Sequence, residues 1–407
     1  MTHHGFATRP CTARAGLALV ILLICADVRA DDDAARTELG LLPLLGGDSD
    51  LGLGGGALGS ITRIEPGWEP YRYRVEVGAV VTFKTDGELQ VPYQDVYVLW
   101  TIPDLIPKRL RLELRPSYTR ERNQNYYGIG NATRAPELGP LDQPAVDYFQ
   151  YGRMHPTLQL RLLLHLGHGF FLGLGNSLTY NELYVHPGSK LDADRHDPQL
   201  AGFFGPTGPH WVDFFEYTLL YDTRDNETSA QSGMHHQLRL RLSPGGTEAF
   251  PYRYGQVDVI ARFFTTHGRS VFAARVVGDA QFGDPPFYEL ARFEDTFALG
   301  GVNGVRGVPG QRYYGKLKLF GNLEWRARLV DFRLFGLPCS LGSALFFDAG
   351  RLWAPDPELD GPALGLKFGV GAGLRLQQGQ AFVARADLAW SPDARPIGAY
   401  VTAGQLF

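Results

Sequence analysis

Apolar and polar side chains alternate residue by residue along much of this chain. From Tyr71 to Lys84 the odd positions carry Tyr, Val, Ala and Phe, whereas most of the even positions are charged or small. The same alternation recurs in residues 109–118, 237–242 and 316–329. Successive side chains of a β-strand point to opposite faces of its sheet. Each stretch therefore predicts a strand with one apolar face and one charged face.

Two kinds of sheet protein show this alternation, the soluble β-sandwich and the transmembrane β-barrel. Many of the predicted strands run for about 11 to 15 residues, whereas soluble strands usually have roughly 5 or 6. Tyr71, Phe83 and Trp325 lie near the ends of apolar faces, as interfacial girdles do. Arginines of several strands share the charged face, which requires a wide, wet interior. We therefore predict an all-β fold, a transmembrane antiparallel up-and-down β-barrel with a polar lumen.

The pattern predicts sixteen strands. Their connections are long after odd-numbered strands, at 122–143, 186–210 and 284–315, and mostly short after even-numbered strands. Outer-membrane barrels combine an even strand number with long extracellular loops and short periplasmic turns. The predicted strands lie near residues 38–47, 51–63, 71–84, 88–102, 109–121, 144–165, 169–185, 211–224, 232–243, 253–266, 270–283, 316–330, 341–353, 364–377, 380–391 and 397–407.

Residues 1–30 have the features of a secretory signal peptide. Two arginines precede an apolar run from Gly16 to Ala26, and Ala30 ends a small-x-small cleavage site. The run is shorter than the roughly 20 residues that a membrane-spanning helix needs. We predict export and cleavage, with residues 31–407 forming one barrel domain in a bacterial outer membrane. The first predicted strand begins too soon after the cleavage site for a folded periplasmic domain to precede it.

Composition narrows the possible functions. The 50 glycines and the 12% aromatic content suit a chain of strands and turns. The formal net charge of −4 argues against a nucleic-acid-binding surface. Cleavage of the predicted signal peptide would leave Cys339 as the one cysteine, so an intramolecular disulfide is not expected.

Two groups of residues could suggest a metal site. The first is made of histidines at predicted strand ends and in loops, with no shared face: His165, His168, His210, His235 and His236. The second is an acidic loop that could hold calcium, with Asp192, Asp194, His196 and Asp197, but it lacks the glycine and the terminal glutamate of an EF-hand. No serine and histidine are evidently paired on one lipid-facing strand, as a membrane phospholipase would require. We therefore predict no metal, no cofactor and no enzymatic activity.

The longest loop carries the most informative motif, with the sequence GGVNGVRG at residues 300–307. Its glycines permit sharp turns, and an arginine directed from such a loop into the barrel would need anionic partners. Glu324 lies on the polar face of the twelfth predicted strand. Asp348 lies on the thirteenth, in phase with Phe346 and Gly350. Adjacent strands would bring the two carboxylates close enough for one guanidinium to contact both.

These motifs resemble those of the BamA/TamA family, also called the bacterial surface antigen family. Val305-Arg306-Gly307 is similar to the family's Val-Arg-Gly motif on the sixth extracellular loop, and Phe346, Asp348 and Gly350 match its Phe-x-Asp-x-Gly motif. The resemblance implies that the loop folds into the lumen and that Arg306 contacts Asp348, with Glu324 as a secondary partner.

Three further segments add to this resemblance. Residues 221–226 (YDTRDN) look like a strand-end signature of the family, and residues 126–131 (YYGIGN) look like a second family segment. Gly404 and Phe407 at the end of the chain are similar to the terminal aromatic signal that barrel-assembly machinery recognises. The resemblance covers essentially the whole of residues 31–407.

The resemblance implies a barrel whose first and last strands pair poorly and can separate sideways. Such an opening would let the protein insert other proteins into the outer membrane or translocate them. The first predicted strand contains Pro43 and paired glycines, which weaken a β-ladder, and an exposed strand edge accepts an added strand.

The expected partners are outer-membrane lipid and unfolded outer-membrane or secreted proteins. Family members that act on such clients carry periplasmic POTRA modules, so either a separate periplasmic partner replaces them here or the barrel acts in a reduced role. The alternatives are a passive porin-like channel and a structural outer-membrane protein. A loop anchored in the lumen would obstruct a channel. The position of this loop therefore distinguishes a passive channel from a protein that opens sideways.

Overall fold

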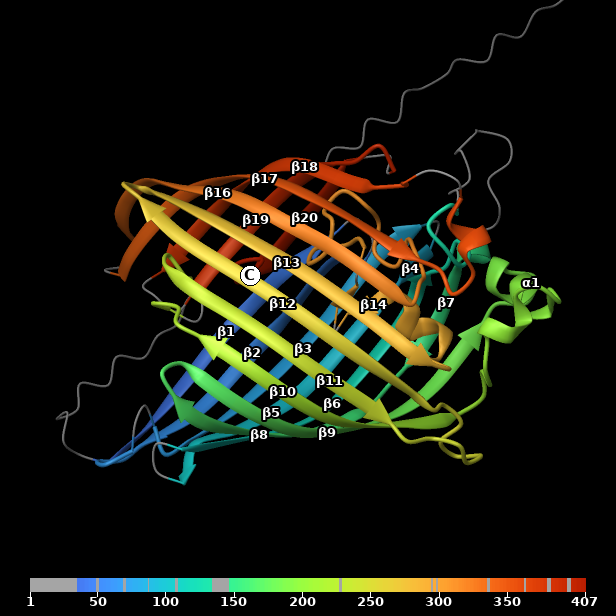
Figure 1. Ribbon diagram of the computed structural model, residues 1–407. Coiled ribbons are helices and arrows are strands. Elements are labelled where there is room, and N and C mark those ends of the chain that lie inside the picture. The colour runs from blue at the N-terminus through green and yellow to red at the C-terminus, as the bar shows by residue number, and fades with distance from the viewer. Residues whose placement is uncertain are drawn as a thin grey trace, which may run out of the picture.

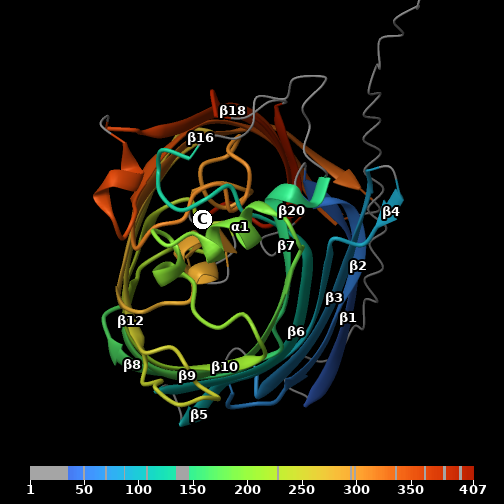
Figure 2. The ribbon, with the colours of Figure 1, turned by 90° about the vertical axis from the view of Figure 1, so that its right-hand side faces the viewer.

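The computed structural model describes residues 35–48, 51–68, 71–86, 88–106, 109–133, 146–226, 229–293, 296–297, 299–334, 337–361, 364–378, 382–393 and 397–407. They form a closed antiparallel β-barrel of sixteen strands (Figures 1 and 2). The predicted signal peptide, residues 1–30, lies outside the described residues.

The wall strands follow one another around the barrel in chain order, and each pairs with its neighbours in sequence. They are β1 (Arg36–Asp48), β2 (Gly52–Ile64), β3 (Tyr73–Asp86), β5 (Tyr93–Ile106), β6 (Leu110–Asn125), β8 (Thr157–Gly167), β9 (Phe170–Val185), β10 (His210–Asp222), β11 (Gly233–Ser243), β12 (Tyr254–His267), β13 (Ser270–Gly283), β16 (Leu317–Leu334), β17 (Leu337–Trp353), β18 (Lys367–Gln378), β19 (Phe382–Trp390) and β20 (Gly398–Ala403).

The remaining elements are short. β4 (Glu88–Gln90) pairs with the end of β3, β7 (Gln150–Met154) continues the wall position of β8, and β14 (Arg292–Phe293) pairs with β15 (Thr296–Phe297). The helices are η1 (Val146–Phe149), α1 (Lys190–His196), η2 (Ala201–Phe203), η3 (Phe287–Ala291) and η4 (Pro357–Asp360). Among the described residues, no helix has the length and the apolar character needed to cross a membrane.

The predicted strand number and the alternation of long and short connections are confirmed. Two predicted strands are interrupted, each next to a proline. The strand predicted at 88–102 divides into β4 and β5 around Pro92, and the one predicted at 144–165 breaks between β7 and β8 at Pro156. Proline has no backbone N–H to give to a β-ladder, so regular pairing stops there.

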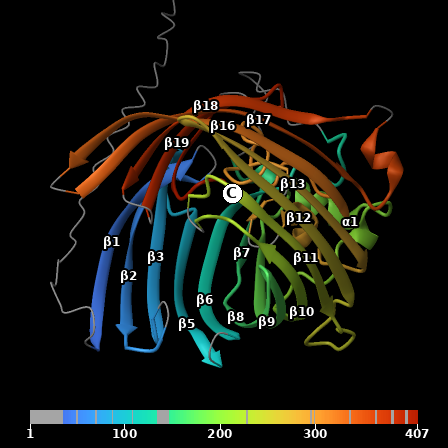
Figure 3. The ribbon, with the colours of Figure 1, turned by 60° about the vertical axis from the view of Figure 1, so that its left-hand side comes forward.

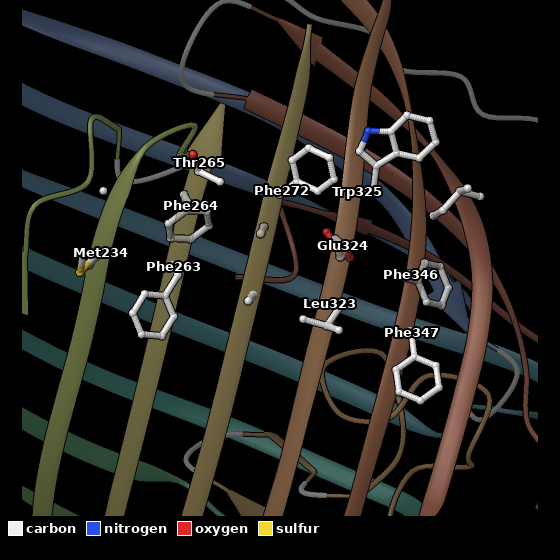
Figure 4. Close-up of a pocket in the computed structure, with 14 residues that line it drawn as sticks. Met234, Phe263, Phe264, Thr265, Phe272, Leu323, Glu324, Trp325, Phe346 and Phe347 are labelled. Atoms are coloured by element: carbon white, nitrogen blue, oxygen red, sulfur yellow. The ribbon is translucent and has the colours of Figure 1, made fainter. Parts of the chain in front are cut away.

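The predicted two faces of the strands are present in the wall. On β16, Leu323 and Trp325 are 56% and 43% exposed, whereas Glu324 between them is 3% exposed and faces the lumen. Figure 4 shows the outward side chains of neighbouring strands, among them Phe263, Phe272 and Trp325, which line an apolar groove of about 780 Å³. Large apolar side chains are exposed on the outer face of most wall strands. Apolar surface of this extent is rare on soluble monomers, and it fits a wall surrounded by lipid.

Three long loops converge at one end of the barrel and form a packed cap there. Figure 2 looks onto this end, where α1 and the neighbouring loops lie inside the outline of the barrel. Gly130 N donates to Tyr314 O (2.8 Å), and Tyr126 Oη donates to Asp194 Oδ2 (2.9 Å). The buried apolar residues of the cap come from all three loops and the adjoining strand: Tyr126, Ile129, Tyr151, Leu191, Phe287, Tyr288, Leu290, Ala291 and Tyr314.

A matched pair of substitutions on β8 tests the assignment of the two faces. Leu160 is 41% exposed on the outer wall, and its neighbour Gln159 lines a polar lumen cavity of about 260 Å³ together with Glu121 and Glu216. Leu160→Lys is expected to lower the free energy of unfolding by up to about 2–4 kcal/mol, because a cation on the lipid-facing side of a barrel wall is costly. Gln159→Lys should cost clearly less, since its charge stays in the polar cavity. Urea unfolding in lipid vesicles measures the free energy of unfolding of both variants. Equal decreases would contradict the assignment of Leu160 to the outer face and Gln159 to the inner face.

Candidate functional site

The loop between β13 and β16, residues 284–316 and hereafter loop 6, turns into the lumen on an apolar base. Val305 and Val308 are fully buried, and Gly301 N donates to Val308 O (2.9 Å), which closes the loop on itself. Gly307 adopts a positive φ of 92°, a conformation that favours glycine. The buried apolar cluster combines loop and wall residues: Ile260, Val277, Phe293, Leu299, Val305, Val308, Tyr313, Phe320 and Leu352.

The side chain of Arg306 is fully buried and is held by carboxylates from three strands. Nε and Nη2 donate to Oδ2 and Oδ1 of Asp348 on β17, at 2.7 and 3.0 Å. Nη1 donates to Glu324 Oε1 on β16 (2.7 Å) and to Asp387 Oδ2 on β19 (3.0 Å). The guanidinium carbon lies 3.4 Å from the ring centroid of Phe346. We call Arg306 and these three carboxylates the loop anchor.

Electrostatic attraction keeps Arg306 charged in this buried position. Burial by itself would lower the pKa of its guanidinium, but the charges of Asp348, Glu324 and Asp387 outweigh burial and hold the pKa above its usual range. A buried ion pair is sustained only when its geometry is good and its remaining hydrogen-bonding groups are satisfied. The bidentate contact with Asp348 meets the first condition.

Other wall arginines balance the remaining carboxylate charge. Arg326 Nε lies 2.7 Å from Glu324 Oε2, and Arg375 Nη1 lies 2.5 Å from Asp387 Oδ1. Each of these carboxylates therefore lies between Arg306 and a second guanidinium. The loop anchor is thus part of a wider network of charges on the inner faces of β16 to β19.

The wall also binds the backbone of loop 6. Three polar side chains of the inner wall donate to carbonyl oxygens of residues 302–304, and these groups would otherwise be buried without partners. The pairs are Arg275 Nη2 with Asn303 O (2.5 Å), Asn322 Nδ2 with Gly304 O (2.8 Å) and Arg385 Nη2 with Val302 O (3.1 Å).

Two glycines of the wall make room for loop 6. A Cβ at Gly350 would overlap Phe320 and lie 2.5 Å from a methyl carbon of Leu299. A Cβ at Gly369, on β18, would overlap the carbonyl oxygen of Arg306. Gly350, the glycine of the Phe-x-Asp-x-Gly motif, therefore leaves space for loop 6, while Asp348 supplies the carboxylate that binds Arg306.

Two residues of this site do not figure among the predicted site residues. Asp387 alternates in phase with Arg385 on a predicted strand, so the phase of the polar face could have identified it. Tyr400 on β20 is 2% exposed, and its hydroxyl accepts from Gly307 N at 2.9 Å. No sequence signal marks Tyr400, because barrel tyrosines also occur in interfacial girdles.

The boundary between β1 and β20, hereafter the seam, is the least paired boundary of the wall. β1 pairs with β2 at thirteen positions, but with β20 only at Gly47–Val401 and Asp48–Tyr400. In Figure 3, β1 to β3 (blue) run side by side, whereas the last strands (red) lie near one end of β1. Pro43 keeps its place opposite Ala57 in the β1–β2 ladder. The weak edge of β1 is thus the one toward β20, where residues 36–44 face no described strand.

The residues after β20 turn into the barrel. Gly404 has a φ of 84°, and Phe407 lies in the lumen, as the position of the C label in Figures 1 and 2 shows. The guanidinium carbons of Arg275 and Arg326 each lie 5.2 Å from the Phe407 ring centroid, and Arg326 Nη2 donates to Phe407 O (3.2 Å). Recognition of Gly404 and Phe407 by assembly machinery stays a prediction.

The histidines and aspartates considered for a metal site make ordinary polar contacts. His210 Nε2 lies 2.7 Å from Tyr288 Oη, and Asp194 accepts from Tyr126 and Lys190. In the part of the chain that the structure describes, no three His, Cys, Asp or Glu side chains are grouped as a metal site requires. Of the two other family-like segments, residues 126–131 lie in the cap, and residues 221–226 lie at the opposite end, where Arg224 Nε donates to Asp222 Oδ1 (2.9 Å).

Comparison with known protein families gives a match over most of the chain. A family model described as "Omp85 superfamily domain" matches residues 82–405. Among curated proteins, none matches this sequence.

Comparison with solved structures supports the same fold. BamA from Haemophilus ducreyi lacking POTRA domains 1–3 is similar with a TM-score of 0.59 and 12% identity, over 95% of this chain and 75% of that chain. CdiB from Escherichia coli has a TM-score of 0.56 and 13% identity, over 94% of this chain and 67% of that chain. CdiB from Acinetobacter baumannii has a TM-score of 0.51 and 11% identity, over 90% and 59% of the two chains.

Removing the central arginine tests the loop anchor. Arg306→Ala is expected to lower the free energy of unfolding by about 3–5 kcal/mol, because buried carboxylates lose their partner. Arg306→Lys should cost less, since it keeps the charge but loses the bidentate geometry. Arg269→Ala is the control: its ion pair with Asp331 is exposed and should contribute less than about 1 kcal/mol. If Arg306→Ala and Arg269→Ala lower the free energy of unfolding by the same small amount, the loop anchor does not stabilise the barrel.

Proposed function

Since the chain belongs to the Omp85 superfamily, we propose that this outer-membrane barrel inserts other proteins into the membrane, or translocates them across it, through the seam. Its partners in this proposal are membrane lipid and unfolded polypeptide clients. The protein makes and breaks no covalent bond. It acts by offering backbone hydrogen bonds to an incoming strand.

The unpaired edge of β1 is the observation that carries this proposal. Backbone N–H and C=O groups without partners cost several kcal/mol each in hydrocarbon. The edge formed by residues 36–44 therefore favours a partner strand, which β20 does not supply over that length. A client segment added to this edge would satisfy these groups by β-augmentation. Opening the seam breaks two paired positions, whereas opening the boundary between β1 and β2 would break thirteen.

The loop anchor lies on one side of the seam only. Arg306 contacts β16, β17 and β19, and Gly307 contacts β20 through Tyr400. These contacts hold the last strands and loop 6 together as one unit. β1 can then move away from β20 while the lumen keeps its loop. This arrangement supports lateral opening in preference to loss of the whole plug.

Loop 6 and the cap argue against the alternative of a passive channel, because both place packed side chains where a porin needs open space. We expect the wild-type protein to show no large, steady conductance in planar bilayers. Arg306→Ala should show larger and more frequent openings, because loop 6 loses its main tether. The same large, steady conductance from both proteins would support the passive channel instead.

A disulfide across the seam tests lateral opening. Gly46 and Thr402 follow the pair Gly47–Val401 in the same register. A Cβ at Gly46 would lie 4.0 Å from the Cα of Thr402 and 2.6 Å from Val401 O, so the two strands must shift slightly apart there to accept the cysteine. In the double variant Gly46→Cys and Thr402→Cys, oxidation is expected to reduce insertion of an unfolded barrel protein into proteoliposomes by about tenfold or more, because client strands can no longer reach the β1 edge. Reduction should restore it.

The control disulfide joins Ser60→Cys and Glu76→Cys, which face each other on β2 and β3. Oxidation there closes no seam and should leave insertion unchanged. Full activity of the oxidised seam variant would refute the proposed route.

A further inference from the structure

β20 is the shortest of the sixteen wall strands that the structure describes. It has six residues, and it pairs with β19 at six positions and with β1 at two. It finishes at the short-turn end of the barrel, which lies opposite the cap. The proposed opening of the seam removes the two pairs with β1, so the ladder with β19 alone remains. A short edge strand of this kind is free to fray or to slip along its neighbour.

The side chains of β20 do little to fix its register, with one exception. Gly398, Ala399 and Ala403 are small, whereas Tyr400 is the largest side chain of the strand. Register is weakly specified where a strand has few packing differences between its two faces, and a slip of one residue exchanges the faces. The contacts of Tyr400 therefore decide whether β20 keeps its place.

Tyr400 connects β20 to loop 6 from inside the barrel. Its side chain is buried and packs against Phe346 and Ala389, with Val302 of loop 6 beside them. Its hydroxyl accepts a hydrogen bond from Gly307 N at 2.9 Å. A buried N–H without an acceptor is costly, so this contact resists movement of Tyr400 away from the loop.

The loop-6 side of this contact is held independently of β1. Gly307 follows Arg306, whose guanidinium is bound by the carboxylates of the loop anchor. A Cβ at Gly307 would lie 3.0 Å from the backbone carbonyl carbon of Trp390, so the loop lies directly against the end of β19. The position of Gly307 N is therefore kept when β1 moves away.

Tyr400 also lies where the seam and the loop anchor meet. Its backbone is paired with Asp48 of β1 on one side and with Asp387 of β19 on the other. Asp387 is itself a carboxylate of the loop anchor and lies 3.0 Å from Arg306. Loss of the pair with Asp48 thus leaves Tyr400 with two supports, the β19 ladder and loop 6.

We propose that Tyr400 is a positioning residue that holds β20 in one register while the seam is open, through its contact with loop 6. A client strand that enters between β1 and β20 then meets a fixed edge on the β20 side. In this role loop 6 supports the wall from inside, in addition to obstructing the lumen. The inference rests on the proposed function and extends it from the β1 edge to the β20 edge.

Disulfide formation across the seam reports the register of β20 in lipid nanodiscs, in a background whose native cysteines are replaced by serine. The matched pair is Gly46→Cys with Thr402→Cys. The mismatched pair is Leu44→Cys with Thr402→Cys, two residues out of register on the same face. The matched pair should oxidise about tenfold faster, because a disulfide needs Cα atoms within roughly 7 Å. Tyr400→Phe keeps the ring but loses the hydroxyl, and it should reduce this ratio to about threefold or less, because β20 then samples shifted registers.

Two further variants separate positioning from a general loss of stability. Tyr252→Phe is the matched control, because Tyr252 is also buried and its hydroxyl donates to Pro206 O (2.8 Å) in the loops near β10 to β12. Its oxidation ratio should equal that of the unchanged protein. Arg306→Lys should lower the ratio as Tyr400→Phe does, because a displaced loop 6 carries Gly307 away from Tyr400.

The outcomes distinguish this inference from the proposed function. An oxidation ratio that is unchanged in Tyr400→Phe, or lowered equally in Tyr252→Phe, would overturn the positioning role. A lowered ratio in Tyr400→Phe together with full insertion by the oxidised seam variant would refute the proposed function alone. Seam-dependent insertion with an unchanged ratio in Tyr400→Phe would refute this inference alone.

Discussion

The fully buried charge of Arg306 is the constraint on which the rest of this lumen depends. A guanidinium removed from water needs opposite charge in good geometry, and three strands supply it through Asp348, Glu324 and Asp387. The path of loop 6 follows from this requirement. The loop must approach the wall closely, which the missing side chains of Gly350 and Gly369 permit. A single buried cation thus fixes both the loop and the strands that receive it.

The seam between β1 and β20 lies close to the loop anchor, but its two strands are paired at only two positions. Tyr400 holds the tip of loop 6 through Gly307 and is also one of the two β20 residues that pair with β1. On the side of Tyr400 away from β1, ion pairs and hydrogen bonds join loop 6 to the group of strands from β16 to β20. On the other side, the ladder to β1 is almost absent. The proposed lateral opening rests on this contrast between a firmly held side and a weakly paired boundary.

The inner wall connects this seam to the short-turn end. Arg326 belongs to the loop anchor network through Glu324, contacts Phe407 and lines a polar cavity at the short-turn end. Buried polar networks of this kind couple their members, because moving one charge changes the balance at the next. The structures of similar fold have only 11–13% identity with this chain. Alternating faces conserve a barrel at such low identity, since they specify a type of side chain at each position and not a particular residue.

The sequence by itself determined the barrel, its sixteen strands and the carboxylates Glu324 and Asp348 as companions of Arg306. The strands and the inward-facing carboxylates follow from a local rule: alternation with a period of two assigns every residue to a face, and neighbouring strands bring their polar faces together. That Arg306 reaches these carboxylates was implied by the resemblance of its loop motif to the family's motif. The same phase places Asp387 on the inner face, but only the tertiary structure decided that it contacts Arg306. Tertiary structure also decided that Tyr400 holds Gly307, that β1 meets β20 at two positions and that Phe407 lies inside the lumen. These features join residues that are distant in the chain, or depend on where the last strand ends against the first. Register at closure is set by the tilt and stagger of all the strands together, and no local pattern carries that information.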